Sequence, residues 1–99
     1  MFNKWVFLID TVDNALSDLE QVGMLRLILF IYRNPGCSRD EAVKGTDISS
    51  TTGRARLDQL RYMDWVNQVD SGERNVKSII LTPAGEKVAA LIGELEKML

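Results

Sequence analysis

One β-hairpin pattern stands in a chain whose other patterns are helical, and this combination sharply limits the fold. Residues 65–69 and 76–81 are rich in β-branched or aromatic side chains, which favour strands. The residues between them, 71–75, have the sequence Ser-Gly-Glu-Arg-Asn, which is typical of a turn. We therefore expect a mainly α fold with one small β-hairpin.

Two long helical patterns precede the hairpin. Between residues 2 and 19, apolar side chains recur at spacings of three and four, which predicts an amphipathic helix. Gly23 marks a break near the start of a second helix, over about residues 22–33, that is apolar nearly all round. This composition predicts central burial. The sequence Asn-Pro-Gly at 34–36 ends the second helix.

Capping signals define the next two helices. Residues 38–41 have the form S-x-x-E, in which the serine side chain caps one backbone amide and the glutamate reaches back to another. We therefore expect a short helix to about Lys44. After a tight connection, Ser49 or Ser50 can cap a longer helix that runs to about Met63 and buries its leucines.

The last helix begins after the hairpin, with Thr82 as the N-cap and Pro83 at the favoured first position. A chain of 99 residues is long enough for one domain and too short for two. We divide this domain into an N-terminal helix (1–20), a core (22–82) and a C-terminal helix (83–99).

Charge and composition exclude several classes of protein. Lys and Arg number 12 against 14 acidic residues, so the net charge of −2 gives no overall basic field. With no histidine and with Cys37 as the single cysteine, metal sites and His-based catalysis lack their usual residues, and a reducing cytoplasm is the simplest compartment. Apolar runs fall short of the roughly 18–20 residues that span a bilayer. We expect a cytoplasmic non-enzyme with no metal, cofactor or membrane association.

Two helices joined by a tight turn and followed by a hairpin form a winged helix-turn-helix, whose second helix can enter a DNA major groove. Residues 60–66, LRYMDWV, resemble the L-x-x-x-G-L-V motif of MarR-like regulators, and residues 81–85, LTPAG, resemble their L-T-x-x-G. Residues 70–75 are similar to the D-x-x-D-x-R of the family's wing, with Asn75 replacing the arginine, so that Arg74 would substitute. The chain resembles small archaeal or viral regulators as much as full-length MarR proteins, which carry more helix.

The resemblance implies a recognition helix over about residues 49–63, and a wing over about 66–81 on the DNA backbone or minor groove. At the end of that helix, Asp64 stands where the motif has glycine. A left-handed backbone is less comfortable for aspartate than for glycine, although aspartate tolerates it better than most residues.

The predicted recognition helix, with Leu57 and Leu60 inward, presents hydroxyls, an arginine and an amide to the outside, and these groups approach phosphates and base edges. Asp58 also faces outward and counts against DNA, whereas Arg56 lies nearer the protein side. Residues 38–77 hold seven basic and seven acidic side chains, so a basic face requires folding to sort the charges. The DNA-binding candidates, with cations of the preceding helix and the wing included, are Arg39, Lys44, Ser50, Thr51, Thr52, Arg54, Ala55, Gln59, Arg74, Asn75 and Lys77.

The terminal helices carry longer apolar stripes than one small domain can cover, which predicts a homodimer. The interface candidates are Phe2, Trp5, Ile9, Val12, Leu16, Leu91, Leu95, Met98 and Leu99. Two-fold symmetry would place two recognition helices in successive major grooves about 34 Å apart, on a palindromic site in double-stranded DNA. Alternatively, the two helices pack on each other within a monomer.

These patterns favour a sequence-specific DNA-binding transcriptional regulator. The alternative is a winged helix that contacts other proteins without binding DNA, in which residues 49–52 only cap their helix and the nearby arginines are solvated. Cys37 is either a redox sensor or a small residue that follows Pro-Gly. Trp5, Phe7 and Met24 either line a pocket for a small-molecule effector or belong to the core.

Overall fold

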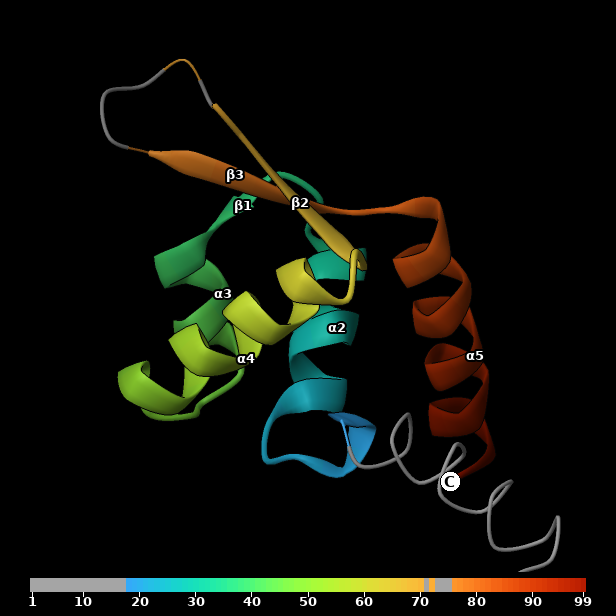
Figure 1. Cartoon of the computed structure of the whole chain (residues 1–99). Coiled ribbons are helices and arrows are strands. Elements are labelled where there is room, and N and C mark those ends of the chain that lie inside the picture. The colour runs from blue at the N-terminus through green and yellow to red at the C-terminus, as the bar shows by residue number, and fades with distance from the viewer. Residues whose placement is uncertain (1–17, 71, 73–75) are drawn as a thin grey trace, which may run out of the picture.

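The computed structural model describes residues 18–70, 72 and 76–99 (Figure 1). It confirms the mainly α fold with a small sheet. The elements in chain order are α2 (Met24–Arg33), β1 (Cys37–Ser38), α3 (Arg39–Gly45), α4 (Ser50–Tyr62), β2 (Val66–Asp70), β3 (Lys77–Leu81) and α5 (Pro83–Met98). Residues 18–20 are helical, and the rest of the predicted N-terminal helix lies outside the described residues.

The sheet has three strands rather than the two of the predicted hairpin. Strands β2 and β3 pair antiparallel, with Val66 opposite Leu81 and Asp70 opposite Lys77. The two-residue strand β1 pairs antiparallel with the other edge of β3, which gives the order β1-β3-β2. The far ends of β2 and β3 project away from the helices (Figure 1).

The predicted caps are present. Ser38 and Glu41 form the complete capping box at the start of α3. Ser49, not Ser50, caps α4 by accepting a hydrogen bond from the backbone N–H of Thr52. Thr82 caps α5 with proline at the first helical turn. Each of these helices therefore begins where its sequence signal predicts.

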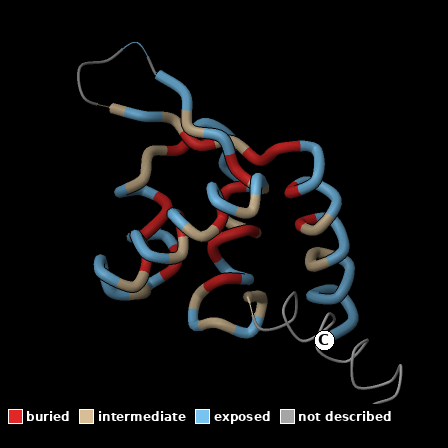
Figure 2. Tube along the Cα trace, in the orientation of Figure 1, coloured by how far each residue is buried: buried red, intermediate tan, exposed pale blue. Residues whose placement is uncertain are grey.

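The hydrophobic core lies between α2, α3, α4, the sheet and the first half of α5 (Figure 2). Helix α2 contributes one fully buried face, Met24, Leu27, Ile28 and Ile31. Burial of this helix on all sides was a wrong prediction, because Leu25 and Tyr32, on one flank of this buried face, are exposed. An apolar composition does not by itself say which side of a helix the fold covers. Met24 belongs to the core, which was one of the two interpretations of this residue.

The two family-like motifs meet in space. Thr82 Oγ1 donates a hydrogen bond to the carbonyl oxygen of Asp64 at 2.7 Å and accepts one from the backbone N–H of Gly85 at 3.2 Å. A Cβ on Gly85 would lie 2.2 Å from the carbonyl oxygen of Trp65, so only glycine permits this approach. Asp64 adopts the left-handed conformation, with φ of 62°. The end of α4 and the start of α5 are thereby locked together.

Candidate nucleic-acid interface

Helices α3 and α4 form the helix-turn-helix that the sequence predicted. They cross closely at Gly53, where an added Cβ would lie 2.7 Å from both methyl carbons of Val43. Gly53, Leu57 and Leu60 form the buried side of α4. The opposite side is exposed, as expected from the helical wheel, at Thr51, Arg54, Ala55, Asp58 and Tyr62. The helix thus turns its hydroxyls and Arg54 away from the core.

The first turn of α4 has one residue that caps the helix and others that stay exposed. The Ser49 hydroxyl is committed to the N–H of Thr52 at 3.1 Å. Ser50 and Thr51 are exposed next to it, and Thr52 is half-buried. The cap therefore fixes the helix start while leaving Ser50 and Thr51 open to a ligand such as a phosphate.

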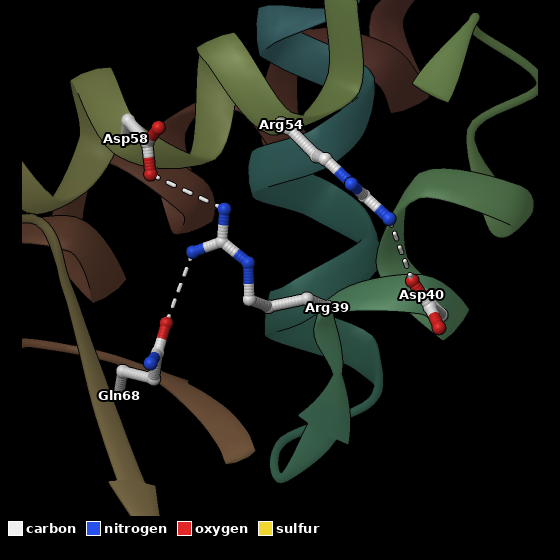
Figure 3. A network of polar contacts seen from close by, with 5 residues as sticks. All are labelled: Arg39, Asp40, Arg54, Asp58 and Gln68. Atoms are coloured by element: carbon white, nitrogen blue, oxygen red, sulfur yellow. Dashed lines mark hydrogen bonds and ion pairs between the residues drawn. The ribbon is translucent and has the colours of Figure 1, made fainter. Parts of the chain in front are cut away.

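Arg39 lies at the junction of three elements rather than free in solvent (Figure 3). From the start of α3, its Nη1 donates to Gln68 Oε1 on β2 at 3.0 Å. Its Nη2 donates to Asp58 Oδ1 on α4 at 3.2 Å. Only 27% of the Arg39 side chain is exposed. One guanidinium therefore ties α3, α4 and the wing together.

Arg54 and Lys77 also face carboxylates. Arg54 Nη2 lies 3.9 Å from Asp40 Oδ1, and both side chains are well exposed. Figure 3 shows the two side chains pointing toward each other. Lys77 pairs with Asp70 directly across the β2–β3 ladder. An open cavity of about 350 Å³ brings these groups together between α3, α4 and the wing; it is lined by Ser38, Arg39, Asp40, Arg54, Val76 and Lys77.

Arg56 holds α4 from the protein side, as its wheel position predicts. Its Nε donates to the backbone oxygen of Val22 at 3.0 Å, and its Nη1 donates to Gln59 Oε1 at 2.8 Å. Gln59 is therefore committed in part to anchoring α4. Its role in reading DNA remains a prediction.

The other predicted DNA-contact residues are less constrained. Lys44 is exposed at the end of α3. Arg74 and Asn75 lie outside the described residues. Sequence reasoning singled out neither Gln68 nor Asp40. The only signal for Gln68 was its polar side chain within a β-rich run, and nothing local connected it to Arg39.

Cys37 does not have the environment of a redox sensor. Its side chain is buried in the core beside β3. Burial, and then the negative charge of Glu41, raise the pKa of the thiol above its usual range. A reactive cysteine needs an accessible thiolate, so the structure favours the interpretation of Cys37 as a small core residue.

The C-terminal half of α5 exposes apolar side chains. Leu91 is 71% exposed, Leu95 52% and Met98 82%, and the terminal Leu99 is also exposed. The N-terminal interface candidates, Phe2 to Leu16, lie outside the described residues. Within the described ranges, no helix is long and apolar enough to cross a membrane, and no group of three acidic or cysteine side chains is placed to hold a metal ion.

Comparison with known proteins identifies the fold. The sequence matches no protein-family profile, and a search of curated proteins finds no match. Among solved structures, the transcriptional regulator SlyA superimposes with a TM-score of 0.74 at 18% identity, over 94% of this chain and 68% of SlyA. FabT of Streptococcus pneumoniae, solved in complex with DNA, has a TM-score of 0.71 at 16% identity, over 97% of this chain and 74% of FabT.

A MarR protein from Peptoclostridium difficile gives a TM-score of 0.70 at 20% identity, over 96% of this chain and 67% of its own length. At such identities the likeness establishes the fold. The chain has the winged helix-turn-helix fold of MarR-like proteins, with α3 and α4 as the helix-turn-helix and β2–β3 as the wing.

Proposed function

We propose that this chain is a sequence-specific DNA-binding transcriptional regulator that acts as a homodimer and not as an enzyme. The recognition helix, about residues 49–63, enters the major groove. The wing, about residues 66–81, lies on the backbone or in the minor groove. The fold supports this proposal, because SlyA is a transcriptional regulator and FabT was solved in complex with DNA.

One observation carries the proposal: the exposed N-terminal turns of α4 lie beside a cavity that holds cations from three elements. Thr51, Arg54 and Ala55 face outward, and Ala55 is small enough to permit close approach to DNA. Arg39 and Lys77 line the neighbouring cavity. Helices of this type dock by their first turns, so the cavity is placed to receive a backbone phosphate while α4 reads base edges.

The dimer is proposed from the apolar face of α5, defined by Leu91, Leu95, Met98 and Leu99. Contiguous exposed apolar surface of this kind is uncommon on monomeric proteins and marks interfaces. A second copy related by a two-fold axis would cover the face with the same residues. Two α4 helices would then meet successive major grooves about 34 Å apart, so the DNA site is expected to be palindromic.

A second candidate function is a winged helix that binds another protein without DNA. The same apolar face of α5 favours it, together with the ion pairs that neutralise Arg39, Arg54 and Lys77. In this case the partner covers α5, and α4 contacts nothing specific.

Selection from random duplex DNA tests the proposed function. Recovery of an enriched, palindromic sequence supports a dimeric regulator, whereas no enrichment contradicts it. A salt titration separates the two candidates. Binding through several phosphates falls steeply as salt rises, but an apolar protein interface is much less sensitive.

The proposal also includes a single domain with the boundaries 1–20, 22–82 and 83–99, and a cytoplasmic location. A small-molecule effector remains a prediction without an assigned pocket.

A further inference from the structure

Every cation that lines the candidate cavity is paired with a carboxylate of the same surface. Arg39 pairs with Asp58, Arg54 with Asp40, and Lys77 with Asp70. Each pair joins two different elements: α3 to α4 in the first two cases, and β2 to β3 in the third. Positive and negative charges therefore balance on this surface, as they do over residues 38–77 as a whole.

The exposure of these carboxylates leaves them only a small part in folding stability. Exposed ion pairs contribute little to folding, and the side chains of Asp40, Asp58 and Asp70 are 75%, 65% and 80% exposed; among their partners, Arg39 is the one that is mostly covered, at 27%. Arg39 can keep its bond to Gln68 without a charged partner, because Gln68 is neutral. The negative charge of Asp58 is therefore not needed to hold the Arg39 side chain in place.

Asp58 is the carboxylate best placed to act on a ligand of α4. It lies on the outward side of the helix, one turn after Arg54 (Figure 3). A phosphate that approaches Arg39 must compete with Asp58 for the same guanidinium and is repelled by its negative charge. Both effects act on any DNA sequence, because phosphates carry no sequence information.

We propose that Asp58, with Asp40 as a second member, restrains sequence-independent DNA binding by occupying the cations that phosphates would otherwise use. This inference rests on the proposed function and identifies residues that limit its backbone affinity. DNA is then retained where base contacts of α4 add to a weakened backbone contact.

The test is the variant Asp58→Asn, measured on a mixed-sequence duplex at several salt concentrations. Asparagine keeps an oxygen that can accept the Arg39 hydrogen bond, so the change removes charge with little change in shape. We expect affinity to rise about three- to tenfold at low salt. The dependence of log affinity on log salt is expected to steepen by about one unit, because one more phosphate contact releases a counterion. Asp40→Asn is expected to shift affinity in the same direction by less, since its pair is longer.

Glu94→Gln is the matched control, because it removes one negative charge from α5, where Glu94 pairs with Lys97 of the same helix. It is expected to leave DNA affinity unchanged. If its affinity rises as much as that of Asp58→Asn, the effect is one of net charge alone, and the inference is wrong. Unchanged, weaker or undetectable binding by Asp58→Asn overturns it as well. The proposed function fails separately, when the unmodified protein enriches no sequence from random DNA.

Discussion

The crossing of α3 and α4 makes a sharp prediction at Gly53. A Cβ added there would lie 2.7, 2.7 and 3.1 Å from three atoms of the Val43 side chain. Real Cβ atoms essentially never lie within 3.0 Å of a heavy atom from a residue that is not a chain neighbour, so something must shift. Valine is branched at Cβ and stiff, and Val43 is only 6% exposed, so it cannot rotate away freely. The variant Gly53→Ala must therefore push the recognition helix away from α3.

Two opposing effects set the change in the free energy of unfolding that we expect for Gly53→Ala. Alanine favours a helix interior over glycine by about 1 kcal/mol. Overpacking of a well-packed core costs about 1–3 kcal/mol, and contacts with three atoms of one stiff side chain place this site at the upper end. We expect a net loss of about 2 kcal/mol in the free energy of unfolding. For a domain of this size that loss corresponds to a fall in Tm of roughly 8–16 °C.

Gly93 provides the matched control within the same chain. It lies inside α5, and nothing is within 4 Å of the Cβ that alanine would add. Gly93→Ala should therefore stabilise the protein by about 1 kcal/mol, through helix propensity alone. Thermal unfolding followed by circular dichroism compares the two variants directly. If Gly53→Ala is as stable as Gly93→Ala, the close crossing of α3 and α4 is wrong.

A double variant isolates the contact itself. Val43→Ala removes the two methyl carbons that the new Cβ would meet, so Gly53→Ala should be less destabilising in its presence. The coupling free energy between the two sites is expected to be about 0.5–3 kcal/mol. Additive effects would show that the loss at Gly53 arises elsewhere.

Three further predictions concern DNA contact, association and the core thiol. Arg54→Ala should weaken binding to a selected duplex by about 1–3 kcal/mol and relax its sequence preference; equal loss on random DNA would indicate a phosphate contact instead. Light scattering should give about twice the 11.2 kDa chain mass, and Leu95→Glu should return it to one chain mass; a single-chain mass without the substitution excludes the dimer. Cys37 should react with iodoacetamide at least about tenfold more slowly in the folded than in the unfolded protein, and equal rates would contradict its burial. Because the folded state holds this thiol in its protonated form, its contribution to stability is present below the usual thiol pKa and is lost as pH rises through the raised value.

Local signals explain what the sequence could predict about the fold. The capping box at Ser38, the cap of α4 and the Thr82-Pro83 start of α5 each act within one turn, so they are visible in a few consecutive residues. The inward leucines of α4 were predicted for the same reason, because helical periodicity fixes the relative directions of side chains. These local features therefore predict where the recognition helix lies without any knowledge of tertiary contacts.

Long-range contacts explain what could not be predicted. Strand β1 has two residues, too few to show an alternating pattern, and it exists only because Cys37 and Ser38 reach the free edge of β3. Arg39 reaches Asp58 and Gln68 across 19 and 29 residues of sequence. No spacing rule connects such positions. The sequence therefore predicts which kinds of residue the site uses, but not which residues they pair with.

Under the proposed function, the ion pairs on the α4 surface limit the part of the DNA affinity that comes from phosphate contacts. A neutral segment can yield a basic face only if folding separates the signs, and here each cavity cation instead meets a carboxylate. The backbone contribution of one copy is then small, because affinity through phosphates scales with the number of cations that release counterions. Two copies on one duplex act as a bivalent ligand, in which the second contact forms at high effective concentration. Weak backbone binding at each α4 therefore makes a dimer a requirement for DNA binding, and loss of the α5 interface should abolish it even when the recognition helix is intact.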